Sequence, residues 1–155
     1  MLRDCGKRSM KSLDTNVLLY ALNEDCPEHS HARNILEQIQ DEPQLWIFSD
    51  QVFYELYGAI RNPSVLSRPR SAQEAANIVD FLRNKTGCLH CSPDTRLWPK
   101  IFHKLSEKTF SRHRTFDAVL AYTLIQNNVH TFYTRNTKDF EDFGFVKLLN
   151  PIPEN

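Results

Sequence analysis

The chain has 155 residues, of which 41% are apolar and 25% are charged, a composition typical of one globular domain. Lysine plus arginine and aspartate plus glutamate both number 19, so the zero net charge excludes a polybasic, histone-like protein. The glycines form neither a GxxxxGK nor a GxGxxG loop, no apolar run approaches the roughly 18 residues of a membrane span, and no signal peptide is recognisable. We therefore expect a cytoplasmic protein.

The first half of the chain alternates short apolar runs with helical periods, a pattern typical of strands and crossover helices. Residues 1–9 have no period and are predicted to be a disordered leader, with the folded domain over 10–151 and a tail over 152–155. The elements predicted in this half are a strand over 12–14, a helix directly after it, an amphipathic helix over 28–40, a strand over 45–48 and a helix capped by Ser49 and Asp50 that runs to about Ile60.

The second half continues the same alternation. Ser71 and Glu74 have the spacing of a capping box, which predicts a helix over the apolar period that follows. Cys88 and Cys91 lack a second ligand pair for zinc, so their segment is interpreted as a strand. The other elements predicted in the second half are a strand over 89–92, helices over 93 to about 108 and over 116–126, and strands over 131–134 and 146–149. The chain is predicted to be an α/β protein, a three-layer sandwich around a parallel sheet of about five short strands.

Acidic residues lie at several points where this fold would place a site. Ligands bind at the carboxyl ends of parallel strands, and Asp14 ends the first predicted strand, while Asp139 follows the fourth. Asp117 opens the apolar helix, and Glu55 lies among small and apolar residues, so we expect its carboxylate to be partly buried. Each aspartate alone is also explained by a helix cap, a helix dipole or a turn.

Carboxylates that meet at one sheet edge repel each other unless a cation neutralises them. Ligation by oxygen alone selects Mg²⁺ or Mn²⁺ over zinc. A shared divalent ion is therefore the hypothesis that explains the acidic residues together.

Basic residues are concentrated just before Asp117. Lys100, Lys104 and Lys108 are spaced four residues apart, which would form one stripe on a helix. Such a stripe is either a solvated helix face or a grip on a phosphate backbone. The predicted nucleic-acid contacts are Lys100, Lys104, Lys108, Arg112 and Arg114.

Four segments of the chain resemble a known family. They are Ser-Leu-Asp-Thr-Asn-Val-Leu-Leu-Tyr-Ala at 12–21, Phe-Asp-Ala-Val-Leu-Ala at 116–121, Thr-Arg-Asn-Thr-Lys-Asp-Phe at 134–140 and Leu-Asn-Pro at 149–151. Together they are similar to the PIN domain of VapC-type toxins, and the likeness covers about residues 10–151. The resemblance implies a metal-dependent endoribonuclease, the toxin of a toxin-antitoxin pair, which hydrolyses RNA phosphodiester bonds.

The resemblance also implies roles for individual residues. Asp14, Glu55 and Asp117 would hold one or two Mg²⁺ or Mn²⁺ ions, and Asp139 would be the fourth acidic residue. Asn136 stands where many relatives carry aspartate, which leaves open which of Asn136 and Asp139 fills that position. The residues matched to supporting positions are Asn16, Thr134 and Asn136. The implied partners are RNA, a small antitoxin encoded nearby and a second copy of the chain, with no membrane.

Other functions remain open from the sequence. A PIN-like nuclease outside a toxin pair, acting in RNA processing or on DNA, has the same residues. A noncatalytic PIN-like module would hold metal poorly because of Asn136. A receiver-like phosphoacceptor domain also gathers acidic residues at strand ends, but it needs a lysine after its phosphoacceptor strand that we do not find.

Overall fold

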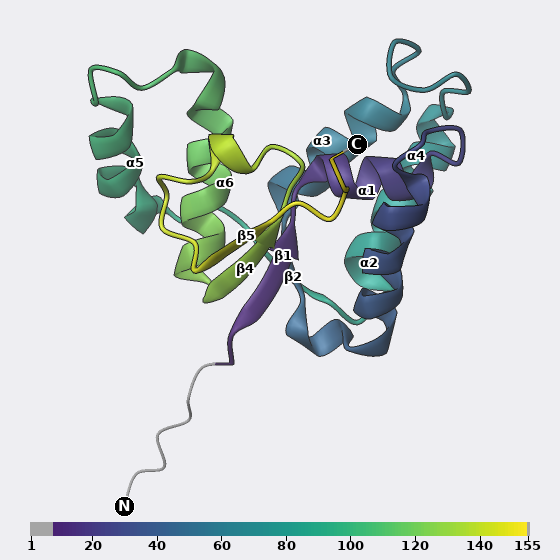
Figure 1. The fold of residues 1–155 in the computed structure, drawn as a ribbon, viewed down its shortest axis with the longest axis horizontal. Coiled ribbons are helices and arrows are strands. Elements are labelled where there is room, and N and C mark those ends of the chain that lie inside the picture. The colour runs from purple at the N-terminus through teal and green to yellow at the C-terminus, as the bar shows by residue number, and fades with distance from the viewer. Residues whose placement is uncertain (1–7, 155) are drawn as a thin grey trace, which may run out of the picture.

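A computed structural model describes residues 8–154, so that most of the predicted leader lies outside the described residues. Five short strands and six α-helices alternate along the chain, as the apolar pattern predicts (Figure 1). The strands are β1 (Met10–Leu13), β2 (Ile47–Ser49), β3 (Leu89–Cys91), β4 (Val129–Tyr133) and β5 (Lys147–Leu149). The helices are α1 (Thr15–Leu22), α2 (His29–Asp41), α3 (Asp50–Ile60), α4 (Ala72–Asn84), α5 (Trp98–Leu105) and α6 (Thr115–Gln126).

The strands form a parallel sheet with β1 at its centre. β1 pairs with β4, β4 pairs with β5, and β2 pairs with β3, all in parallel. A single parallel bridge between Lys11 and Trp46 joins the two groups of strands. The sheet lies between the pair α5 and α6 and the group α1 to α4, which confirms the predicted three-layer α/β sandwich (Figure 1).

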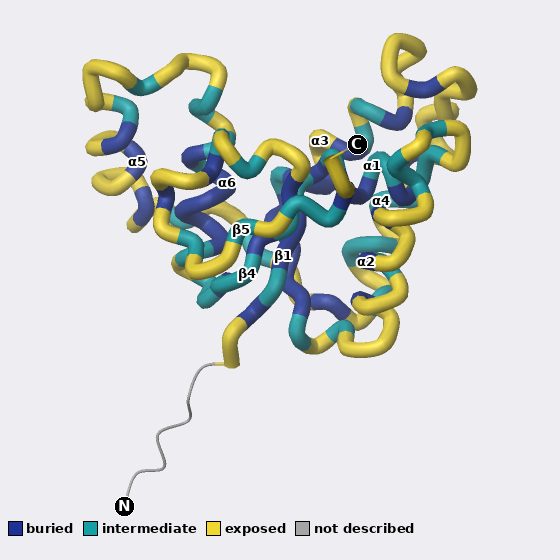
Figure 2. The backbone as a smooth tube through the Cα atoms, viewed as in Figure 1, coloured by how far each residue is buried: buried dark blue, intermediate teal, exposed yellow. Residues whose placement is uncertain are grey.

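The core lies on both faces of the sheet. Trp46, Phe53, Phe132 and Phe140 are the largest fully buried side chains. Burial is densest along β1 and the sheet-facing sides of the helices, whereas the outer surface of α5 is exposed (Figure 2). No helix within residues 8–154 has the length and apolar character needed to cross a membrane.

Local signals in the sequence place the helix starts well. Asp14 caps α1 by accepting the backbone N–H of Thr15 at 2.8 Å, and Ser49 caps α3. The capping box is present at α4, where Ser71 and Glu74 bond each other's backbone N–H groups.

The predicted long helix over 93 to about 108 is wrong. A 3₁₀ turn (Thr95–Leu97) precedes α5, and α5 ends at Leu105. The next four residues, Ser-Glu-Lys-Thr, contain no apolar side chain that another turn of helix could bury against the core. Lys108 therefore lies beyond the helix.

Candidate active site

Asp14 lies at the carboxyl end of the central strand, where hydrogen bonds hold both of its carboxylate oxygens. The hydroxyl of Thr134, directly after β4, donates to Oδ2 at 2.8 Å, and the amide of Asn16 donates to the same oxygen at 3.2 Å. Burial raises the pKa of Asp14 to about 6, although the hydrogen bond from Thr134 opposes the rise. The negative charges of Glu55 and Asp117 raise this pKa further.

Glu55 projects from α3 toward the start of α1, but the expected partial burial is wrong. Phe53 and Leu56 take the core-facing side of α3, so Glu55 is exposed. Its two carboxylate oxygens accept hydrogen bonds from different elements. The Thr15 hydroxyl donates to Oε2 at 2.7 Å, and the Gln51 amide donates to Oε1 at 2.8 Å. The carboxylate is therefore fixed by two donors and not by a buried environment.

Asp117 occupies the first turn of α6 and faces the same edge of the sheet. Burial raises the pKa of Asp117 to about 6, the charge of Asp139 adds to the rise, and Arg114 opposes it. The charge of Glu55 raises this pKa as well. Asp14, Glu55 and Asp117 thus influence one another electrostatically, although 41 and 62 residues separate them in turn along the chain.

The loop after β4 carries both candidates for the fourth acidic position. Asp139 ends a 3₁₀ turn (Thr137–Asp139), is half-buried, and acts on the pKa of Asp117 through its charge. Asn136 is exposed and donates its backbone N–H to the Thr134 hydroxyl at 3.0 Å. Of the two residues, Asp139 is the one that adds negative charge next to Asp117.

The donor set matches a hard divalent cation in its chemistry. The acidic residues offer oxygen atoms only, and their negative charges add to the rise in pKa that burial causes at Asp14 and Asp117. Over residues 8–154, no three His, Cys, Asp or Glu side chains are grouped as a ready-made metal site. To share one ion, these carboxylates would have to lie closer together than they do here.

The predicted basic stripe is not a free cationic surface. Lys104 is only 7% exposed and forms ion pairs with Glu107 at 2.9 Å and with Asp142 at 2.7 Å. Lys100 lies over the ring of Tyr122, with its Nζ 4.9 Å from the ring centroid. The prediction of one stripe of three lysines on one helix is wrong, because α5 ends at Leu105, before Lys108, and because Asp142 from later in the chain pairs with Lys104.

Arg114 is likewise held by the protein itself. Its guanidinium pairs with Asp142, donates to the backbone carbonyl of Asp139 at 2.6 Å, and lies over the ring of Phe143. Arg112 is exposed, and no ion pair is found for it among the described residues. Of the two arginines before α6, only Arg112 has a guanidinium free to contact a substrate phosphate.

Two residues of the site were missed by the sequence analysis. Thr15 and Gln51 both donate to Glu55, and Gln51 also donates to the backbone carbonyl of Phe116 at 3.1 Å. The available signal was spacing, because Gln51 stands four residues before Glu55 on a predicted helix and Thr15 directly follows Asp14.

Comparison with known proteins identifies the family of this chain. The model of the PIN domain family matches residues 12–146, so the chain belongs to the PIN domain family. It is 38% identical to Ribonuclease VapC24 of Mycobacterium tuberculosis over 144 residues, which cover 92% of this chain and 97% of that protein. It is also 29% identical to VapC ribonuclease Mb2897 of Mycobacterium bovis over 143 residues, covering 92% and 96% of the two chains.

A solved structure has the same fold. It is the crystal structure of VapBC2 from Rickettsia felis bound to a DNA fragment from their promoter, and the match has a TM-score of 0.61 at 18% identity. The match covers 91% of this chain and 98% of that chain. At this identity the likeness supports the three-layer architecture.

Proposed function

We propose that the protein is a metal-dependent endoribonuclease that hydrolyses RNA phosphodiester bonds as the toxin of a VapBC-type pair. The observation that carries this proposal is that Asp14, Glu55 and Asp117, from three separate parts of the chain, lie near enough to act on one another's charge at the carboxyl edge of a PIN-domain sheet. Burial, with a smaller contribution from neighbouring negative charges, raises the pKa of Asp14 and of Asp117 to about 6. The VapC ribonucleases similar to this chain support RNA as the substrate.

The residues divide into holding and orienting roles. Asp14, Glu55 and Asp117 would hold Mg²⁺ or Mn²⁺, with Asp139 nearby. A bound ion of this kind lowers the pKa of a water molecule to give the attacking hydroxide and offsets charge on the phosphate. Thr134 and Asn16 orient Asp14 through the hydrogen bonds to Oδ2.

Substrate contacts lie at the start of α6. Arg112 is the exposed cation nearest in sequence to Asp117, and Phe116, next to Asp117, is 69% exposed. A guanidinium binds backbone phosphate, and an exposed aromatic ring can stack on an unpaired base. Single-stranded RNA therefore suits this surface.

Cleavage of a mixed RNA pool tests the proposed activity. We expect cleavage by the wild type with Mn²⁺, none in EDTA, and none by Asp117→Asn. Cleavage that persists in EDTA or in the variant would reject the metal mechanism. A wild type that neither cleaves RNA nor binds Mn²⁺ in calorimetry would instead indicate a noncatalytic PIN-like module.

We also propose an antitoxin partner. The similar solved structure is of VapBC2, and this chain has an apolar cavity of about 540 Å³ among α1, α2, α3, α4 and β2. Leu18, Ile39 and Phe53 contribute to its wall, with the exposed Phe81 also lining it. An amphipathic segment of a small protein suits such a surface. Co-purification with the product of a small neighbouring gene, and loss of cleavage in the complex, are the expected results.

A homodimer is the second assembly we propose. Tyr54 on α3 is 74% exposed beside the half-buried Tyr57, an aromatic pair that a second copy would cover. Light scattering of the purified chain should give twice the monomer mass, and Tyr54→Ser should shift the mass toward the monomer.

A further inference from the structure

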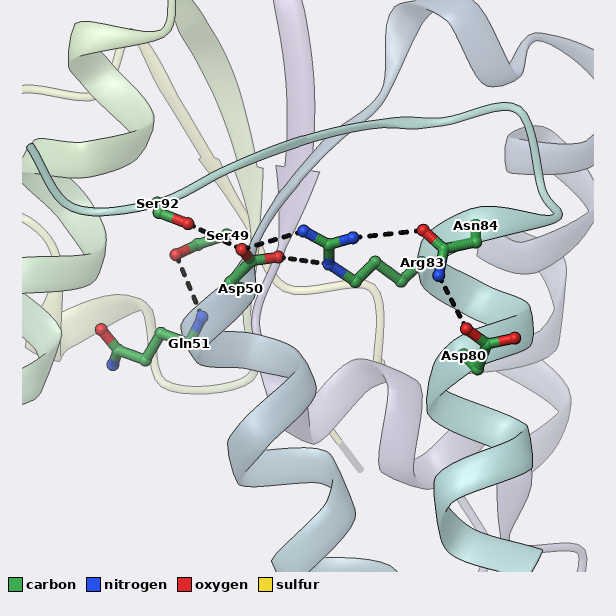
Figure 3. A network of polar contacts seen from close by, with 7 residues as sticks. All are labelled: Ser49, Asp50, Gln51, Asp80, Arg83, Asn84 and Ser92. Carbon is green, nitrogen blue, oxygen red and sulfur yellow. Dashed lines mark hydrogen bonds and ion pairs between the residues drawn. The ribbon is translucent and has the colours of Figure 1, made fainter.

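Side chains of the first turn of α3 form hydrogen bonds with other elements on two opposite sides of the helix. Asp50 accepts hydrogen bonds from Arg83 on α4 at 2.8 Å and from Ser92 after β3 at 2.7 Å. The Gln51 side chain points away from this network, as Figure 3 shows. The two neighbours thus face different parts of the molecule, Asp50 toward α4 and Gln51 toward the start of α6.

Gln51 connects two of the helices that carry acidic residues. Its Nε2 donates one hydrogen to Glu55 Oε1 at 2.8 Å and the other to the carbonyl oxygen of Phe116 at 3.1 Å. Both partners can only accept hydrogen bonds, so the amide nitrogen must be the atom that faces them. Phe116 directly precedes Asp117, and the Gln51 amide therefore spans the gap between Glu55 and the helix turn that holds Asp117.

We propose that Gln51 is a positioning residue, whose amide sets the spacing between Glu55 and the start of α6. This inference rests on the proposed function. Glu55 is exposed, and a free glutamate side chain loses rotamer entropy when it is held in one geometry.

Two hydrogen-bond donors hold the Glu55 carboxylate in one geometry before any ion binds. Gln51 holds one carboxylate oxygen, and the buried Thr15, next to Asp14, holds the other. Groups that orient the ligands of a metal in this way commonly change metal affinity or activity by about tenfold or more when they are removed.

The test compares two glutamines that each bond a side chain four residues later. Gln51→Leu removes the two hydrogen bonds that the Gln51 amide donates, to Glu55 and to the carbonyl of Phe116. Gln73→Leu removes only the bond from Gln73 to Asn77 on the exposed face of α4. We expect Gln51→Leu to weaken Mn²⁺ binding in calorimetry about tenfold and to lower kcat for RNA by a similar factor, with KM for RNA little changed. Gln73→Leu should match the wild type in all three values. Mn²⁺ affinity of Gln51→Leu equal to that of the wild type would overturn the inference.

Thr15 supplies a second test that does not depend on the folding of Gln51→Leu. Thr15→Val removes the hydroxyl that donates to Glu55, and Thr15→Ser keeps it. The inference requires Thr15→Val to weaken Mn²⁺ binding severalfold and Thr15→Ser to keep the wild-type affinity; equal affinity for the two variants contradicts it. If the wild type neither binds Mn²⁺ nor cleaves RNA, the proposed function fails and this inference fails with it, whereas an active wild type with unaffected variants rejects the positioning role alone.

Discussion

Two groups of carboxylates in this protein have opposite environments. Asp142 lies between Arg114 and Lys104, and the hydrogen bonds from these cations lower its pKa to about 2. Asp14 and Asp117 have no cation of comparable effect, and burial and neighbouring negative charge raise their pKa values to about 6. The protein therefore uses its nearby cations to stabilise the loop that carries Asp142 and leaves the sheet edge negatively charged. Such an edge is destabilising by itself and suited to binding a cation.

The largest effect on RNA cleavage should come from neutralising Asp14 or Asp117. Asp14→Asn or Asp117→Asn removes a carboxylate that we propose holds the ion, and we expect RNA cleavage with Mn²⁺ to fall about 10³-fold or more. The fold should be retained, because each substitution also removes repulsion. Initial rates and thermal melting check both parts. If either variant melts at a lower temperature and keeps its activity, the proposed difference between Asp14 with Asp117 and the ion-paired Asp142 is wrong.

The pH dependence of stability should show the same contrast. A carboxyl whose pKa is about 3.8 in the unfolded chain and about 6 in the folded protein binds more protons when folded between these values. Stability should therefore fall as pH rises from about 4 to about 7, by about 3 kcal/mol from Asp14 and by a smaller amount from Asp117, whose contribution is reduced by its partial exposure.

Urea unfolding in EDTA at several pH values measures this slope. The double variant Asp14→Asn with Asp117→Asn is the control and should lose most of the slope in this range. Stability that rises over the same range in the wild type relative to the double variant would contradict the predicted sign of the pH dependence.

Removing the carboxylate of Asp142, which cations surround, should lower stability and leave RNA cleavage nearly unchanged. Asp142→Asn leaves Lys104 with Glu107 as its remaining ion-pair partner, and we expect a loss of about 1 kcal/mol in the free energy of unfolding. Because Asp14 and Asp117, the carboxylates with raised pKa values, are unchanged in this variant, RNA cleavage at a temperature well below melting should stay within about twofold of the wild type. Urea unfolding and initial rates measure the two effects, and a large loss of activity in the folded variant would count against the division between the groups.

The smallest effect should come from the free cation beside the site. Arg112→Ala removes the proposed phosphate contact and should raise KM for RNA a few fold, with a weaker dependence on salt concentration. Lys104→Met should show no such change in salt dependence, because its ammonium is already paired with acidic side chains. A salt dependence that changes more in Lys104→Met than in Arg112→Ala would restore the lysine stripe as the RNA contact.

Much of the fold was predictable because its signals are local. The apolar periods of α2 and α4, the capping box at Ser71 and the cap at Asp14 each depend on residues within about two turns of helix. Asp14 and Asp117 were likewise found from a strand end and a helix start. Glu55 was found from an expected partial burial that is wrong, together with the family resemblance.

What the sequence by itself determined was the order of the elements, the parallel α/β class and the identity of the acidic residues. Tertiary structure decided which charges are compensated. Asp142 reaches back 28 residues to pair with Arg114, and Gln51 reaches across 65 residues to the carbonyl of Phe116. The exposure of Glu55 also follows from how α3 packs, with Phe53 and Leu56 turned to the core. Burial and charge pairing depend on distance in space, which a pattern along the chain does not encode, and for that reason the carboxylates of one sequence acquire pKa values of about 2 and about 6.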